Sequence, residues 1–283
     1  GGVYPANSLL LLGTILSKGG FEVKIIDGWF DEHYEEQLIS YVKKCKNELV
    51  FIGFTVMTVC VPSALGLFRS IKNIDKNVKI VWGGTHPTLY PEMVLNDENI
   101  DIVAINESAQ NISRLAELLS KQQDISIVNG IAFKGNGHEV IKTNHSKADD
   151  IKAFPRIDYS LIDTSKYITS EHSVYIREFP EFKGTFRIMP ILTALGCPFK
   201  CQFCINVILK RRYRFKTARE CVDEIKNLQN EYGANTFLFM DEDFFINKKR
   251  TFEFIDIVEK EGLHFNWRMW CRVDHFNERY LTR

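Results

Sequence analysis

Short apolar runs alternate with amphipathic stretches over the first 120 residues, and this alternation leaves few folds open to the chain. The run Leu49–Phe54 (LVFIGF) is almost continuously apolar, as expected of a strand that is covered on both faces. An amphipathic helix pattern follows over Pro62–Ile74, and a second apolar run follows at Val78–Trp82. This order predicts an α/β fold with a doubly wound parallel sheet, which binds ligands at the carboxyl ends of its strands.

The same alternation places the other elements of this half. The expected helices are Ser8–Lys18, Glu35–Lys46, Pro62–Ile74, Pro91–Leu95 and Ile112–Lys121. The expected strands are Phe21–Asp27, Leu49–Phe54, Val78–Trp82 and Ile100–Ile105. Because the first residue is Gly1 and no strand precedes the first helix, we expect natural sequence before it.

The second half opens with a different pattern. Two β-rich runs flank Gly135-Asn136-Gly137 within residues 126–144, which predicts a hairpin. Residues 145–190 contain prolines and little periodicity, and we interpret them as a connecting segment. The alternation then returns, with strands expected at 191–195, at 236–240 and within 265–272, and helices at 217–232 and 248–261. Three such units cannot close a barrel, so we expect further sequence after residue 283. We divide the chain into a sheet domain (1–125), a hairpin and linker (126–190) and a partial (β/α) barrel (191–283).

Composition excludes several classes of protein. The 36 Lys and Arg residues balance 36 Asp and Glu residues, which argues against a nucleic acid as the main partner. A basic run at Lys210, Arg211, Arg212 and Arg214 is typical of a solvated surface. No apolar run approaches the ~20 residues of a membrane span, and no signal peptide opens the sequence. Seven cysteines without a secretion signal favour a reducing compartment, so we expect a cytoplasmic protein.

The strongest chemical signal is a cysteine loop, Gly196–Cys204 (GCPFKCQFC), directly after an expected strand. Its three thiols have the spacing C-x3-C-x2-C, and closely spaced thiolates bind soft metals. Zinc would need a fourth ligand, but Cys221 lies on an expected helix and Cys271 on an expected strand, both without a local partner. A zinc loop and three incidental thiols remain the alternatives to an iron–sulfur cluster with one open iron.

This loop resembles the signature of the radical S-adenosylmethionine (radical SAM) enzymes, including the aromatic residue before the last cysteine, Phe203. The resemblance implies that Cys197, Cys201 and Cys204 hold a [4Fe-4S] cluster. It also implies that the open iron binds S-adenosylmethionine, that Phe203 packs by its adenine, and that one electron cleaves the cofactor to a 5′-deoxyadenosyl radical. No catalytic residue beyond the cluster ligands is implied.

Residues after the loop add to this resemblance. The end of the second barrel strand in the family holds the methionine amine, and the candidates here are Asp241, Glu242 and Asp243. The sequence departs from the family's common Gly-Gly-Glu form, so the residue that acts is open, as is a solvated acidic turn. Arg272, on the third expected strand, is a candidate for the cofactor carboxylate or for a structural salt bridge.

The order of domains resembles the cobalamin-binding radical SAM class, in particular the group of the anaerobic magnesium-protoporphyrin ester cyclase and several methyltransferases. FIGFTVMT (51–58), WGGTHPT (82–88) and IDIVAINES (100–108) match the strand ends of its cobalamin domain. The resemblance implies that Gly83 and Gly84 let the backbone approach cobalamin, and that Thr55, Thr58 and Thr85 hydrogen-bond its nucleotide tail. The sequence Asn106-Glu107-Ser108-Ala109 departs from the family's Gly-Glu-Gly-Glu.

The Asp-x-His-x-x-Gly motif that supplies a histidine to cobalt in many cobalamin proteins is absent. His33 follows the wrong strand, and His86 before Pro87 is more typical of a local contact residue. The resemblance therefore implies cobalamin without a histidine ligand from that motif.

Together these features predict a radical SAM enzyme that uses cobalamin for methylation or oxidative cyclisation of a small molecule. Its expected partners are that substrate and a low-potential electron donor such as flavodoxin or ferredoxin, without nucleic acid or a membrane span. The alternatives are a radical SAM enzyme that modifies RNA and a non-enzymatic cobalamin or iron–sulfur sensor. Methylthiolation of tRNA needs a different N-terminal domain with its own three cysteines, whereas Cys45 and Cys60 are isolated here.

Overall fold

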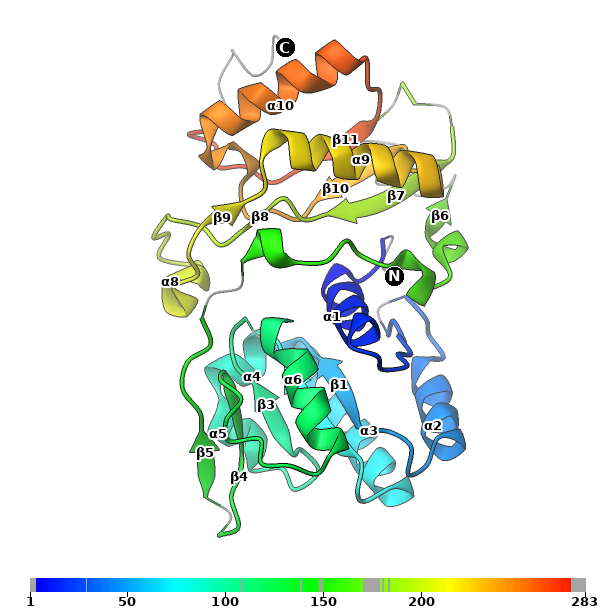
Figure 1. The fold of residues 1–283 in the computed structure, drawn as a ribbon, viewed down its shortest axis with the longest axis vertical. Helices are drawn as coiled ribbons and strands as arrows, with labels where there is room; N and C mark the ends of the chain where they lie inside the picture. Colours follow the sequence, from blue (N-terminus) through cyan, green and yellow to red (C-terminus); the bar gives the residue numbers. More distant parts are fainter. Residues whose placement is uncertain are drawn as a thin grey trace. The chain divides into compact units, whose positions relative to one another are not determined.

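Parallel strands form the centre of two separate sheets in the computed structural model (Figure 1). The structure describes residues 4–28, 30–107, 109–137, 139–147, 150–169, 179, 181–182 and 184–275. These residues form two units, an N-terminal unit (Leu11–Asp149) and a C-terminal unit (Gly1–Leu10 with Asp150–Arg283). The predicted mixed α/β fold is confirmed.

The sheet of the N-terminal unit has the order β1-β2-β3-β4-β5. Strands β1 (Phe51–Thr55), β2 (Lys79–Gly83) and β3 (Ile102–Ala104) are parallel, so their carboxyl ends lie at one edge. The predicted hairpin is confirmed as β4 (Ile131–Lys134) and β5 (Val140–Lys142), which extend the sheet in the antiparallel sense.

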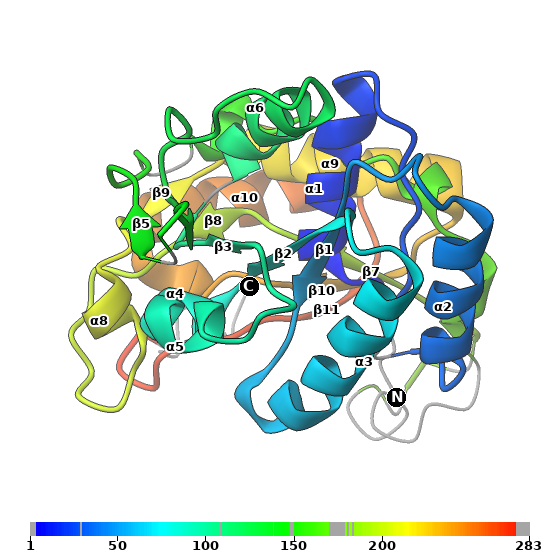
Figure 2. The same ribbon diagram turned by 90° about the horizontal axis from the view of Figure 1, so that it is seen from below.

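Helices cover both faces of this sheet, with α1 and α6 on one face and α3 on the other (Figure 2). The helices of this part are α1 (Asn7–Lys18), α2 (Tyr34–Lys44), α3 (Val61–Ile74), α4 (Thr85–Leu89), α5 (Pro91–Leu95) and α6 (Ala109–Ser120), with the 3-10 helix η1 (Thr58–Cys60) before α3. All five predicted helices are confirmed. The sequence did not predict α4, because five residues containing a proline carry no helical periodicity.

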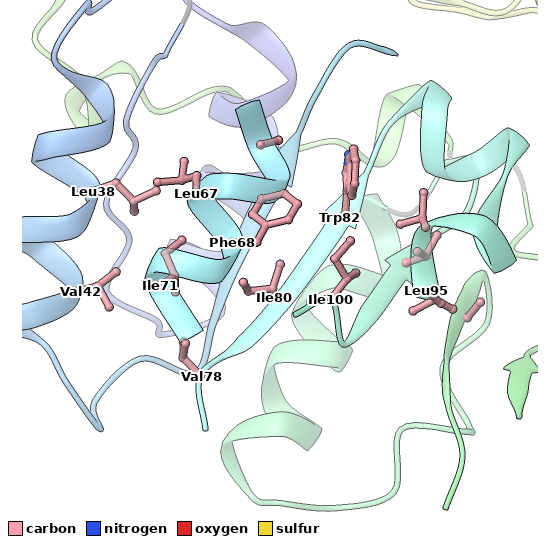
Figure 3. Packing of buried hydrophobic residues seen from close by; sticks show 14 residues of the cluster. Leu38, Val42, Leu67, Phe68, Ile71, Val78, Ile80, Trp82, Leu95 and Ile100 are labelled. Atoms are coloured by element: carbon pink, nitrogen blue, oxygen red, sulfur yellow. The ribbon is translucent and has the colours of Figure 1, made fainter. Parts of the chain in front are cut away.

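Side chains of β2 alternate between two cores, as the period of a strand requires. Ile80 and Trp82 are fully buried in the core on the α3 side, where Trp82 packs against Phe68, whereas Val81 belongs to the core on the α6 side. Figure 3 shows the first core, and its labelled residues are Leu38, Val42, Leu67, Phe68, Ile71, Val78, Ile80, Trp82, Leu95 and Ile100.

The strand predicted over Phe21–Asp27 is wrong, because this segment has no strand structure. A strand exists only where its backbone pairs with a neighbour. Within the described residues, β1 pairs with β2 alone, so the segment has no partner in the sheet.

The C-terminal unit has a four-stranded sheet in the order β11-β10-β7-β6. Strands β7 (Phe186–Ile191), β10 (Thr236–Phe239) and β11 (Asn266–Arg268) are parallel, as in the first part of a (β/α) barrel. Helix α9 (Ala218–Tyr232) connects β7 to β10, and α10 (Lys248–Glu261) connects β10 to β11 (Figure 1). The predicted helix limits are confirmed: Thr217 and Glu220 form a capping box, and Gly233 and Gly262 end the two helices.

The strand predicted from Ile191 to Leu195 begins at Phe186 instead, and Pro190 lies inside it. In a parallel strand, alternate residues direct their backbone groups to opposite neighbours. The Ile191 carbonyl accepts a hydrogen bond from Met240 N on the β10 side, so Pro190 faces the other side. Among the described residues on that side, β6 (Ile168–Thr169) pairs with Phe186 and Arg187, and none of them forms a ladder that the missing N–H of Pro190 would break.

The strand predicted within 265–272 is confirmed as β11, but it ends at Arg268, so the placement of Cys271 and Arg272 on this strand is wrong. Of the predicted connecting segment 145–190, residues 148–149, 170–178, 180 and 183 lie outside the described part. The remaining short elements of this unit are η2 (Ile151–Ala153), η3 (Tyr159–Leu161), η4 (Thr164–Tyr167), β8 (Ala194–Leu195), α8 (Asn206–Leu209), β9 (Arg214–Phe215) and η5 (Phe244–Ile246).

Candidate functional site

The cysteine loop leaves the sheet of the C-terminal unit just after β7. Strand β8 pairs with β9 on the far side of the loop, with Ala194 opposite Phe215 and Leu195 opposite Arg214. This two-stranded ladder closes the loop at its base. The three cysteines therefore project from a fixed base at the carboxyl end of the parallel strands, where α/β proteins bind ligands.

Gly196 opens the loop in a conformation that other residues rarely adopt, with φ of +72°. A Cβ atom at this position would lie 2.3 Å from the carbonyl oxygen of Arg212, which is backbone and cannot move aside easily. Close approach of the two loop ends thus requires glycine here.

The thiols of Cys197, Cys201 and Cys204 are free and half-buried. Burial raises the pKa of Cys197; the Phe199 backbone N–H opposes this, and the nearby carboxylates of Glu242 and Asp243 raise the pKa further. The end of β10 thus lies close to the loop. Within the described residues, no three His, Cys, Asp or Glu side chains converge closely enough to hold a single metal ion.

Cys221 does not contribute a fourth ligand. It lies on α9 with no exposed surface, and burial raises the pKa of its thiol to about 12. It therefore remains a protonated core residue, as its place on a predicted helix suggested.

Asp241, a predicted cofactor-binding residue, is fully occupied by protein groups. Its carboxylate accepts hydrogen bonds from the backbone of Thr193 (2.7 Å) and Ala194 (2.8 Å) and from the Thr193 hydroxyl (2.5 Å). The Arg250 guanidinium lies 3.3 Å away and also donates to the Thr193 hydroxyl. Burial raises the pKa of Asp241, and the hydrogen bonds from Thr193 and the charge of Arg250 oppose this rise.

This network joins the end of β10 to the start of the cysteine loop. Sequence reasoning missed Thr193 and Arg250, because a single Arg in the first turn of a helix carries no signal of its partner. Arg250 also lies over the ring of Phe244, with its guanidinium carbon 4.7 Å from the ring centroid.

Asp243 is likewise buried and holds the turn after β11. Its carboxylate accepts from Phe245 N (2.9 Å) and Arg272 N (3.3 Å), and it lies 2.7 Å from the His275 ring.

Glu242 and Phe203 are different, because both are exposed, Phe203 at 93%. Among the predicted cofactor-binding residues of this region, these two present free surface.

Arg272, predicted to face a cofactor carboxylate, reaches the cysteine loop. Its Nη1 donates to Cys201 Sγ at 3.0 Å, and its guanidinium carbon lies 4.2 Å from the centroid of Phe199. Its Nε and Nη2 donate to the two oxygens of Asp274.

The five predicted cobalamin-binding residues lie together at the carboxyl edge of the N-terminal sheet. Thr55 and Gly83 are register partners, and a Cβ on Gly84 (φ +103°) would lie 3.0 Å from Thr55 Oγ1. Thr58 and Thr85 follow β1 and β2 and are exposed, as is Thr55. At this edge, three threonine hydroxyl groups therefore lie beside the backbone of two glycines.

His86 is buried beside this edge rather than presented on it. It is 5% exposed, stacks on Trp82, and its Nδ1 lies 3.3 Å from Thr58 Oγ1. This agrees with a local contact residue. Sequence reasoning missed the exposed apolar side chains near the same edge, namely Met57, Val59 and Tyr90.

At the end of β3, Asn106 adopts a left-handed conformation with φ of +58°. Its backbone N–H donates to Thr88 Oγ1, while its side-chain Oδ1 is buried and has no hydrogen-bond partner in the described structure. Because a buried acceptor needs a partner, this oxygen is a candidate to accept a hydrogen bond from a ligand.

Among the residues that the structure describes, no helix is long and apolar enough to cross a membrane.

The sequence matches two known families. Residues 1–116 match the B12 binding domain, and residues 191–277 match the radical SAM superfamily.

Curated relatives match almost the whole chain. It is 28% identical over 260 residues to the uncharacterized methyltransferase PH0819 of Pyrococcus horikoshii, covering 91% of this chain and 53% of that protein. It is 26% identical over 279 residues to the anaerobic magnesium-protoporphyrin IX monomethyl ester cyclase of Rubrivivax gelatinosus, covering 96% of this chain and 47% of the cyclase. The chain thus spans about half the length of these relatives.

Solved structures share the fold. The cobalamin-dependent S-adenosylmethionine radical enzyme OxsB aligns with a TM-score of 0.73 at 19% identity, over 98% of this chain and 37% of OxsB. The radical S-adenosylmethionine methyltransferase TsrM from Kitasatospora setae aligns with a TM-score of 0.67 at 17% identity, over 91% of this chain and 48% of TsrM.

Proposed function

Because this chain belongs to the cobalamin-binding radical SAM proteins, combining a B12-binding domain with a radical SAM domain, we propose that it forms part of an enzyme that methylates or oxidatively cyclises a small molecule by radical chemistry. The observation that carries the proposal is the cysteine loop. Three free thiols with C-x3-C-x2-C spacing stand on a closed base at the carboxyl ends of β7, β10 and β11.

The three thiols fit an iron–sulfur cluster better than a single ion. A zinc site needs a fourth ligand, whereas a [4Fe-4S] cluster with one open iron needs three thiolates. The three described thiols are half-buried in one loop, and the buried Cys221 supplies no fourth ligand. Cys197, Cys201 and Cys204 would therefore hold the cluster. When bound and reduced by an external donor, the cluster would supply the electron that cleaves S-adenosylmethionine.

The different environments of the three acidic residues after β10 suggest how S-adenosylmethionine is held. Asp241 and Asp243 have their carboxylates bonded to protein groups, so their role is to fix the ends of the strands. Glu242 is exposed between them and would bind the methionine amine. Phe203, 93% exposed, would pack against the adenine, since an exposed aromatic ring gains most from covering a flat apolar partner.

The carboxyl edge of the N-terminal sheet would hold cobalamin. Gly83 and Gly84 let the ligand approach the backbone, and the hydroxyls of Thr55, Thr58 and Thr85 would bind its polar groups. Because His86 is buried against Trp82 and Thr58, we propose that it does not bind cobalt. When bound, cobalamin would supply the methyl group in a methyl transfer.

The names of the relatives give two reactions, methyl transfer and cyclisation. Either one needs a low-potential electron donor, and we propose flavodoxin or ferredoxin in this role. The two reactions differ in their products, because a methyl transfer adds one CH₂ unit to the substrate and a cyclisation does not. Mass spectrometry of the product therefore separates them.

The test is cleavage of S-adenosylmethionine by the anaerobically reconstituted full-length protein that contains this chain. With dithionite as reductant, we expect release of methionine and 5′-deoxyadenosine or, in methyl transfer, of S-adenosylhomocysteine as well. Iron and sulfide analysis that finds a lone zinc ion and no product would overturn the proposal. Hydroxocobalamin that passes through gel filtration without the protein would overturn the cobalamin part alone.

A further inference from the structure

Arg272 makes contacts that its predicted role as a carboxylate binder does not explain. Although it lies 71 residues after Cys201, its Nη1 donates to that cysteine's Sγ at 3.0 Å. The same guanidinium covers the face of Phe199, within the loop, at 4.2 Å from the ring centroid. The first contact directs a permanent positive charge at one of the three thiols, and the second holds the guanidinium beside the loop.

Other contacts hold the guanidinium in this position. Asp274 accepts from Nε at 3.0 Å and from Nη2 at 2.7 Å, a two-point contact that fixes the plane of the group. The backbone of Arg272 is fixed as well, because its N–H donates to Asp243 and its carbonyl accepts from His275 N. The donor to sulfur is therefore positioned by the end of β10 and by its own turn.

This arrangement disfavours binding of a cofactor carboxylate. A guanidinium recognises a carboxylate best through two parallel N–H groups, and Asp274 already occupies the pair on Nε and Nη2. One hydrogen of Nη1 points to Cys201. A second carboxylate is therefore left with the remaining N–H of Nη1 and that of Nη2, beside a sulfur contact that already uses one hydrogen of Nη1.

We propose that Arg272 is a positioning residue for the iron–sulfur cluster. Its guanidinium donates a hydrogen bond to the Cys201 thiolate and raises the reduction potential of the cluster. The inference rests on the proposed function. Reduction adds one electron, and a nearby cation with an N–H bond to a ligand sulfur stabilises the added negative charge. Removing it should therefore make the cluster harder to reduce.

The experiment is a redox titration of the reconstituted full-length protein without S-adenosylmethionine, comparing the wild type with Arg272→Gln. Loss of a charge-assisted hydrogen bond should shift the reduction equilibrium by on the order of tenfold toward the oxidised cluster. For one electron this is a lowering of about 59 mV. The control is Arg268→Gln, whose guanidinium lies over Trp270, and we expect it to shift the equilibrium less than twofold.

Iron content and the binding of S-adenosylmethionine are measured on the same samples. An unchanged potential with weakened cofactor binding would overturn the proposal in favour of a carboxylate contact, and two unchanged values would overturn it as well. If Arg272→Gln assembles no cluster, the titration is repeated with Arg272→Lys. The lysine keeps the positive charge, but its ammonium cannot bind Asp274 at two points and still reach the sulfur. A several-fold shift in the same direction supports the proposal, and a wild-type potential contradicts it. A wild-type protein without iron would instead refute the proposed function.

Discussion

The Asp241 carboxylate and the Thr193 hydroxyl lie 2.5 Å apart and join two strand ends that are 48 residues apart in the sequence. Arg250 completes this contact from α10, with a side chain that is only 3% exposed. The base of the cysteine loop thus depends on a buried ion pair whose charges are hydrogen-bonded on several sides. Such pairs fix geometry, and removing one partner leaves a buried charge without compensation.

Replacing Arg250 with Met should lower the free energy of unfolding by about 3–5 kcal/mol, because Asp241 would keep a buried charge that has lost its partner. Urea denaturation followed by circular dichroism measures the change. Lys249→Met is the matched control, since the neighbouring side chain is 87% exposed, and it should change stability by less than about 0.5 kcal/mol. Equal effects of the two variants would contradict the role given to the pair.

Replacing Gly196 with Ala should disturb the cysteine loop directly. The new Cβ would lie 2.3 Å from the Arg212 carbonyl, so the loop base must open at a cost on the order of 3 kcal/mol. We expect less iron per chain after reconstitution. Gly262→Ala has a similar φ of +61° but no atom within 4 Å of the new Cβ, and should cost only about 1 kcal/mol with full iron content.

Replacing Cys201 with Ala should abolish the absorbance of the cluster near ~400 nm and the cleavage of S-adenosylmethionine, because two thiolates cannot hold the cluster with one open iron. Absorbance, iron content and 5′-deoxyadenosine are measured together. Cys60→Ala, an exposed cysteine of the other unit, should retain all three signals. Cleavage by the Cys201 variant would show that the loop does not carry the chemistry.

Asp75 predicts a dependence of stability on pH. Burial alone would raise its pKa, but hydrogen bonds from the backbone of Asn77, Asn47 and Val78 lower the pKa below 3.8 overall. Its folded pKa thus lies below the unfolded value, so its stabilisation is complete above about pH 4 and is lost as pH falls through the folded pKa.

Asp75→Asn should therefore cost about 1 kcal/mol at pH 7, and the difference from the wild type should shrink steadily below pH 4. Urea denaturation at a series of pH values measures it. The exposed Glu98→Gln serves as the control and should run parallel to the wild type. A gap between wild type and Asp75→Asn that stays constant down to pH 2 would rule out this linkage.

The sequence alone determined the elements and the chemistry whose signals are local. Caps at Thr217, Gly233 and Gly262, the hairpin turn and the cysteine spacing each lie within a few residues, so they can be read without a partner. For this reason the helices lie where the sequence predicts them. The two matching families agree with the predictions made from the cysteine loop and from the first sheet.

Only the tertiary structure decided which of the candidate residues are free to bind. The carboxylate of Asp241 is hydrogen-bonded to Thr193 and paired with Arg250. Arg272 lies beyond the strand on which it was predicted and donates to Cys201, and the segment 21–27 forms no strand. Each outcome depends on a partner distant in sequence, or on the lack of one within the described sheet. Burial and pairing are set by such long-range contacts, which the order of residues does not display.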